Sequence, residues 1–117
     1  MKDLIIIGGS IAGTTAAVYA ARRKLDFVLV AADLGGEVAV SGVIENWPGV
    51  NHTDGVELAE KLKGQLKYNE VLIDEGFTVE TLEQKNGAWV VAAVSLAGEK
   101  KTYEARAVII ATGVKPK

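Results

Sequence analysis

Residues 4–13 read LIIIGGSIAG, an aliphatic run that ends in a glycine-rich turn. The run Leu4–Ile7 shows no alternation of apolar and polar residues, which is typical of a strand buried on both faces in a parallel sheet. Alanines dominate from Ala12 to Arg22, so a slim helix is expected to follow the turn. Phe27–Val30 is a second short apolar run. Strand, glycine turn, helix and strand in this order predict a βαβ unit.

The composition narrows the class of protein. The chain has 117 residues, a net charge of −2, no cysteine and one histidine, His52. This length suits one domain. Without cysteine the chain has no redox dithiol, and one histidine gives no multi-histidine metal site, so neither a metal site nor a catalytic residue is predicted. Binding to nucleic acid or to a membrane is not expected either, because the charge is near neutral and no apolar run is long enough to cross a bilayer. A cytoplasmic protein is the expectation, since the N-terminus lacks a signal-peptide core.

The middle of the chain predicts an ordered loop and a second helix. Residues 31–52 contain three turn signals but little periodicity. Asp54 is expected to cap a helix, with Glu57 as its capping-box partner. Leucines at positions 58, 62 and 66 then share one face of that helix. Val71–Ile73 is expected to be a third parallel strand.

An antiparallel meander is predicted next. Alternating residues, the Asn86-Gly87 turn and a second turn at Ala97-Gly98 predict three strands over 78–83, 89–94 and 101–105. Val108–Ala111 is expected to be a further buried strand. In a nucleotide-binding half of the NAD type, helices join successive parallel strands. Here a meander joins the third to the fourth, which points instead to an FAD domain: an α/β, Rossmann-like, three-layer fold of the glutathione reductase type.

The turn at residues 8–13 has the geometry of a dinucleotide site. The first amides of a helix have no partner within the helix, and its dipole places partial positive charge there, so a diphosphate can bind. Gly8 allows the tight turn and Gly13 lets helix and strand touch. Ser10 stands where the pattern G-x-G-x-x-G has its middle glycine, and its hydroxyl could donate to phosphate or cap the helix. The glycines could also serve turning and packing alone.

An acidic residue normally holds the ribose after the second strand, about 20 residues past the glycines. The sequence has Ala31-Ala32-Asp33 at this place. Asp33 comes late, and we interpret it as the start of the turn into Leu34-Gly35-Gly36 rather than as a ribose ligand.

Four segments in order, with the meander between them, carry a resemblance to a known family. They are residues 3–22, the turn Gly35-Gly36-Glu37, residues 44–49 (IENWPG) and residues 109–113 (IIATG). Over essentially its whole length the chain resembles the N-terminal FAD segment of low-molecular-weight thioredoxin reductases of the bacterial and archaeal type. The resemblance implies FAD as cofactor.

The resemblance also implies site residues. The diphosphate would bind at the first turn, the ribose beside two alanines, the flavin beside the second glycine turn and an asparagine, and the adenine beside the third strand, with a last turn closing the site. The residues are, for the diphosphate, Gly8, Gly9, Ser10, Ile11, Ala12 and Gly13; for the ribose, Ala31 and Ala32; for the flavin, Gly35, Gly36, Glu37 and Asn46; for the adenine, Glu75 and Gly76; and for the last turn, Ala111, Thr112 and Gly113. Asn46 could instead only initiate the turn at Pro48-Gly49.

The chain departs from the family pattern in three respects. Ser10 and Ile11 replace Gly-Pro, and Glu37 replaces glutamine. Family members also continue into an NADPH domain with Cys-x-x-Cys and then into a segment that completes the FAD domain; residues 1–117 contain neither, so a single FAD-binding domain is expected.

Two functions stay open. One is the FAD-binding part of an NAD(P)H-dependent disulfide reductase, inactive as this chain alone. The other is a stand-alone nucleotide-binding or self-associating module without catalysis. If the other half of the FAD fold is absent, an unpaired edge along Val108–Ala111 is expected, and with it a homo-oligomer such as a dimer, or a completing polypeptide segment, as partner.

Overall fold

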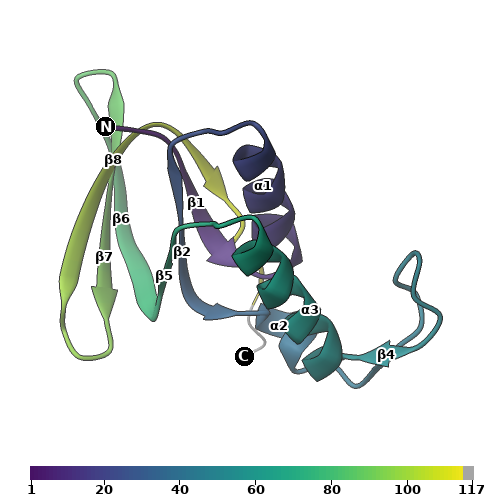
Figure 1. Cartoon of the computed structure of the whole chain (residues 1–117). Helices are drawn as coiled ribbons and strands as arrows, with labels where there is room; N and C mark the ends of the chain where they lie inside the picture. The colour runs from purple at the N-terminus through teal and green to yellow at the C-terminus, as the bar shows by residue number, and fades with distance from the viewer. Residues whose placement is uncertain (115–117) are drawn as a thin grey trace.

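The structure, a computed structural model, describes residues 1–114. It contains a large mixed sheet with helices on one of its faces and a small sheet of two strands, β3 and β4 (Figure 1). Along the chain the elements are β1 (Lys2–Gly9), α1 (Ile11–Arg22), β2 (Phe27–Leu34), α2 (Gly36–Ala39), β3 (Val43–Ile44), β4 (Thr53–Asp54), α3 (Gly55–Tyr68), β5 (Ile73–Glu75), β6 (Phe77–Lys85), β7 (Ala88–Ser95) and β8 (Lys100–Ile110). The order in the large sheet is β5-β2-β1-β8-β7-β6. Its first four strands are parallel, and β6 and β7 join antiparallel.

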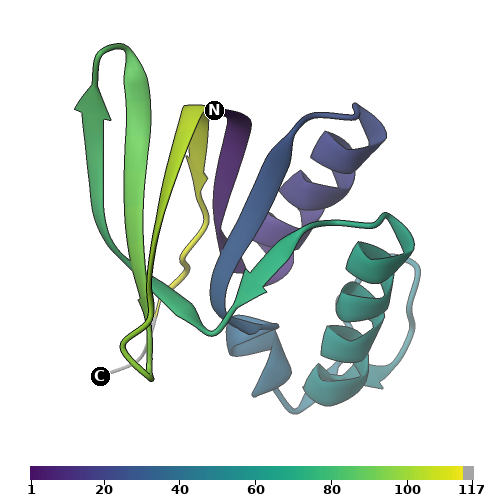
Figure 2. The same ribbon diagram turned by 60° about the vertical axis from the view of Figure 1, so that its left-hand side comes forward.

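The molecule has three layers, as predicted. The helices α1 and α3 cover one face of the parallel strands, and the meander folds over the other face (Figures 1 and 2). Leu4 and Ile6 of β1 pack toward the helices, whereas Ile5 and Ile7 pack toward Val91 and its neighbours in the meander. Successive side chains of a strand point to opposite faces, and here both faces are covered. This explains why the apolar run of β1 shows no alternation.

The last strand corrects one prediction. The predicted strands 101–105 and 108–111 are one continuous strand, β8. Its first half pairs with β7 as far as Ala105, which lies opposite Trp89 near the start of β7, and its second half pairs with β1 from Ala105 to Ile110. Beyond Ala105 the side of β8 away from β1 therefore lacks a β7 partner. Ile109 is 39% exposed and Ile110 65%, so the prediction that this run is buried was wrong.

The second helix and the hairpin confirm the sequence pattern. Asp54 caps α3 by accepting a hydrogen bond from the Glu57 N–H (2.8 Å), and the three leucines of its apolar face are buried. Asn86 and Gly87 both have positive φ (51° and 78°), as a two-residue hairpin turn requires. The predicted loop over 31–52 is more regular than expected, since it contains the end of β2, the short α2 and β3. Residues 43–54 form an arm that projects away from the sheet (Figure 1).

Candidate functional site

A cleft of about 540 Å³ opens at the carboxyl ends of β1 and β2. The chain leaves β1 toward β2 on one side, while β8 lies on the other side, so this is the point where the strand order reverses. Ligands of open α/β sheets bind at such a point. The volume falls in the range of roughly 300–1,000 Å³ that is usual for small-molecule sites. The lining residues are Ile7, Gly8, Gly9, Ser10, Val30, Ala31, Ala32, Asp33, Gly36, Val40, Phe77, Thr78, Val79, Ala111, Thr112, Gly113 and Val114.

At two positions of the first turn, close packing by itself is enough to require glycine. A Cβ on Gly8, whose φ is +113°, would lie 2.0 Å from the Ala111 carbonyl oxygen. A Cβ on Gly13 would lie 1.8 Å from the Gly8 carbonyl oxygen. These glycines bring the ends of β1, β8 and α1 into backbone contact. They therefore shape the cleft, but they do not by themselves identify its ligand.

The N-terminus of α1 is open. Ser10 is its N-cap residue and makes no side-chain cap, and the first turn contains no acidic residue. The first intrahelical bond runs from the Thr14 N–H to the Ser10 carbonyl (2.9 Å), so the amides of Ile11, Ala12 and Gly13 have no partner within the helix. Free amides and the helix dipole favour an anion at this place.

Ser10 does not cap its helix, which was one of the two roles considered for it from the sequence. Its hydroxyl donates to the Gly35 carbonyl (2.7 Å), 25 residues away, and not to the amides of its own helix. Gly35 in turn donates its N–H to the Gly9 carbonyl (2.8 Å). A Cβ on Gly36 would lie 2.9 Å from the Ser10 Cβ. The turn between β2 and α2 is thus held directly against the turn between β1 and α1.

Asp33 corrects a second prediction. The register between β1 and β2 passes from Ile7↔Val30 to Gly9↔Leu34, so β2 spends two more residues than β1 on this interval. Asp33 lies in this irregular part of β2 and lines the cleft, and the strand continues to Leu34. The interpretation that Asp33 begins the turn was therefore wrong, because counting along the chain does not reveal a β-bulge.

Most of the sequence-predicted site residues meet at the cleft. Nine of them line it: Gly8, Gly9, Ser10, Ala31, Ala32, Gly36, Ala111, Thr112 and Gly113. Ile11, Ala12 and Gly13 continue from its wall into α1, and Gly35 is bonded to it as described above. Glu75 and Gly76 directly precede the lining residues of β6, and the Gly76 N–H donates to the Ala31 carbonyl (2.8 Å).

Of the remaining two predicted residues, one lies away from the cleft and the other has a side chain that the structure does not describe. Asn46 is exposed in the arm and is not among the lining residues. It lies one residue before the turn closed by the Val50 N–H and the Trp47 carbonyl (3.0 Å). The backbone of Glu37 belongs to α2, and its side chain lies outside the described part of the structure.

The apolar wall of the cleft escaped the sequence reasoning. Val30, Val40, Phe77 and Val79 contribute to it, together with Ile7 and Val114. Phe77 and Val79 belong to the first meander strand, which was expected to serve only as a crossover. Ile7 and Val30 are the last residues of the apolar runs Leu4–Ile7 and Phe27–Val30, and that terminal position is the one signal in the sequence that could have identified them.

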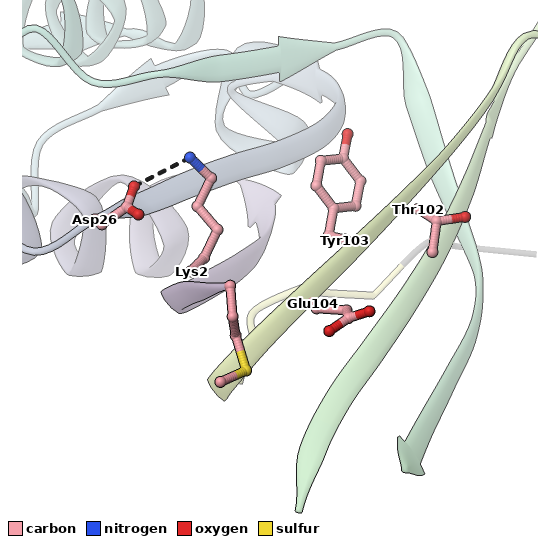
Figure 3. A pocket seen from close by; sticks show the side chains of 6 residues that line it. Lys2, Asp26, Thr102, Tyr103 and Glu104 are labelled. Carbon is pink, nitrogen blue, oxygen red and sulfur yellow. Dashed lines mark hydrogen bonds and ion pairs between the residues drawn. The ribbon is translucent and has the colours of Figure 1, made fainter. Parts of the chain in front are cut away.

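A second, more polar hollow of about 450 Å³ lies at the opposite end of β1 (Figure 3). Its polar groups are largely paired already. Figure 3 shows Lys2 reaching Asp26, at 3.1 Å. The Tyr103 hydroxyl donates to Asp74 (2.5 Å), and burial, followed by this bond to a carboxylate, raises the pKa of Tyr103 above its ordinary value. The first contact joins the start of β1 to the residue before β2, and the second joins β8 to β5. We assign the hollow no ligand.

Residues 1–114 contain no cluster of three or more metal-ligating side chains. Within the same range, no helix has both the length and the apolar character needed to cross a membrane.

Comparisons with known proteins agree on one family. A family model described as pyridine nucleotide-disulphide oxidoreductase matches residues 2–117. The thioredoxin reductase of Listeria innocua is 36% identical over 112 residues, which are 95% of this chain and 33% of that protein. A 34.2 kDa protein encoded in the rubredoxin operon of Clostridium pasteurianum is 35% identical over 114 residues, which are 97% of this chain and 35% of that protein.

Solved structures show the same likeness. The crystal structure of thioredoxin reductase from Streptococcus pyogenes superposes with a TM-score of 0.86 at 37% identity, over 100% of this chain and 37% of that one. The chain thus spans about a third of the length of the proteins that it matches.

Proposed function

The chain belongs to the pyridine nucleotide-disulphide oxidoreductase family, and on this basis we propose that it forms a single FAD-binding domain whose cleft takes the adenosine diphosphate part of FAD. The observation that carries the proposal is the uncapped N-terminus of α1 at the wall of that cleft. A 12-residue helix that starts without a side-chain cap and without an acidic residue leaves its positive end to an anion. The diphosphate is the anionic part of FAD.

The remaining groups of the cleft suit the rest of the nucleotide. Among the lining residues that the structure describes, Asp33 is the acidic one, and its carboxylate can accept hydrogen bonds from the ribose hydroxyls. Phe77, Val30 and Val79 give the apolar surface that an adenine ring requires. The amides of Ile11 to Gly13 are left for the diphosphate. In this proposal the adenosine diphosphate is held mostly by backbone and by apolar contact.

The activity concerns the whole protein, of which the chain spans only part of the length seen in its relatives. We propose that the whole protein is an NAD(P)H-dependent oxidoreductase that acts on a disulfide or another acceptor, and that FAD held at the cleft would supply the two-electron transfer. The chain contains no cysteine, so the dithiol of such a reaction must come from elsewhere. We therefore expect residues 1–117 alone to show no NADPH-dependent disulfide reduction.

The test of FAD binding uses the purified chain. It is mixed with FAD, passed over a gel-filtration column and examined for a flavin absorbance band that elutes with the protein. FMN, which carries the flavin but no adenosine diphosphate, serves as the control. Retained FAD, excluded FMN and displacement of FAD by ADP are the expected results. A folded chain that stays colourless and does not bind ADP would favour a module without flavin.

The edge of β8 supports a proposal about partners. Ile109 and Ile110 are exposed on a strand that has no β7 neighbour beyond Ala105. Such an edge can pair with another chain, and we expect two copies to associate through it. Sedimentation should give a mass that rises with concentration, and Ile110→Lys should shift it toward the monomer. A mass that is independent of concentration in the unmodified chain would contradict this.

A further inference from the structure

We propose that Ser10 is a positioning residue, which holds the two turns that frame the cleft at the separation that FAD needs. The inference rests on the proposed FAD site. It concerns one side chain at which this chain departs from the glycine of the G-x-G-x-x-G pattern.

The link between the two turns consists of two hydrogen bonds around one residue. The Ser10 hydroxyl donates to the Gly35 carbonyl (2.7 Å), and the Gly35 N–H donates to the Gly9 carbonyl (2.8 Å). Gly35 is also the N-cap residue of α2, and its carbonyl accepts from the Val38 N–H (3.1 Å). The serine hydroxyl therefore anchors the beginning of α2 to the first turn.

The same bond determines what Ser10 can offer a ligand. A serine hydroxyl has one proton to donate, and here the Gly35 carbonyl receives it. Donation to a phosphate would require the bond between the turns to break. The amides of Ile11, Ala12 and Gly13 remain for the anion. Ser10 thus acts on the ligand through the second turn.

The backbone conformation at position 10 gives no separate reason for a serine there. Its φ of −93° and ψ of −151° lie in a region open to any residue, so neither glycine nor serine is required there by conformation. The steric fit is with Gly36, where a Cβ would approach the Ser10 Cβ to 2.9 Å. A side chain at position 10 and a bare glycine at position 36 are complementary surfaces of one contact.

The wall that this contact positions includes Gly36 and Val40, which line the cleft. FAD continues beyond its diphosphate into the ribityl chain and the flavin, whereas ADP ends there. A ligand that extends past the second turn should depend on the position of this wall, and a ligand that stops at the first turn should not.

The experiment compares Ser10→Ala with the unmodified chain by calorimetric titration with FAD and with ADP. Loss of one hydrogen bond should weaken FAD binding about fivefold while ADP binding stays within about twofold. Thr15→Ala is the matched control, because Thr15 donates to the Ile11 carbonyl (2.8 Å) in the same helix and does not touch the second turn. It should leave both affinities unchanged.

Several outcomes would overturn the proposal. An equal loss for FAD and ADP would mean that the hydroxyl binds the diphosphate itself, and unchanged FAD binding would mean that the link does not matter. Hydrogen exchange of the ligand-free chain gives an independent readout, since the amides of residues 36–40 should exchange faster in Ser10→Ala and not in Thr15→Ala. If the unmodified chain binds neither ligand, the FAD site has failed, and unchanged exchange would then reject the link between the turns as well.

Discussion

The two long helices of this domain begin in opposite ways. At α3, Asp54 accepts from the Glu57 N–H, the Gly55 N–H donates to the Ser41 carbonyl (3.1 Å), and an acidic residue lies in the first turn. At α1 the N-cap side chain is bonded elsewhere, and the first turn has no acid. One helix start is satisfied by its own chain, and the other is left for an anion. This difference is the basis of our proposal that the start of α1, and not the start of α3, belongs to the ligand site.

The glycines inside the two helices differ in the space around them. Gly13 of α1 lies against the Gly8 carbonyl, where a Cβ has no room, whereas a Cβ on Gly64 of α3 would meet nothing within 4 Å. Gly13 therefore sets how closely α1 approaches the sheet, and Gly64 has no such role. Substitutions in the two helices therefore test whether α1 and α3 differ in this way.

The largest effect is expected from Gly13→Ala. The added carbon would lie 1.8 Å from a backbone oxygen, so helix or strand must move, and the free energy of unfolding should fall by about 3 kcal/mol. Gly64→Ala is the control and should raise it by up to about 1 kcal/mol, because alanine is the better helix former. Urea unfolding measures both. Equal effects at the two positions would show that α1 is not packed as described.

The next effect comes from giving α1 the acidic first turn of α3. Ala12 is exposed, so Ala12→Glu fits without a clash. The carboxylate should stabilise the helix by about 0.5 kcal/mol and weaken FAD binding roughly tenfold, since it repels the diphosphate. Ala12→Gln keeps the size without the charge and should bind FAD normally. Undiminished binding by Ala12→Glu, measured by titration, would place the diphosphate elsewhere.

The smallest effect of the three concerns the cap of α3. Asp54→Ala removes the acceptor for the Glu57 N–H and should lower the free energy of unfolding by about 1 kcal/mol. Affinity for FAD should not change, because this helix end is a structural one. Urea unfolding and FAD titration of the same sample check both halves of the prediction. A loss of affinity would erase the distinction between the two helix starts.

Local patterns in the sequence predicted most of the fold and its family. The run Leu4–Ile7, the glycine turn and the Asn86-Gly87 hairpin each depend on residues that are neighbours in the chain. The continuity of β8 could not be read this way. In the sequence, Arg106 stands between apolar residues and suggests a break between two strands. In the structure Arg106 is exposed on one continuous strand, which pairs with β7 up to Ala105 and with β1 from Ala105 onward.

The features of the site also fall into those that a local sequence pattern predicts and those that depend on tertiary contacts. The open amides of α1 were predictable, since they follow from a strand that turns into a helix. The place of Asp33 depends on a bulge in β2, and the place of Phe77 depends on how the meander returns over the sheet. The partner of the Ser10 hydroxyl lies 25 residues away. Contacts of this kind arise from tertiary packing, for which the sequence pattern gives no local signal.

If the cleft is an FAD site, the first amides of α1 receive a diphosphate and those of α3 do not. An ADP titration followed by amide NMR tests it most directly, because it reads both helix starts in one sample. The largest shifts are expected at Ile11, Ala12 and Gly13, and none at Val56 or Glu57. Shifts confined to other residues, or equal shifts at the two helices, would contradict it.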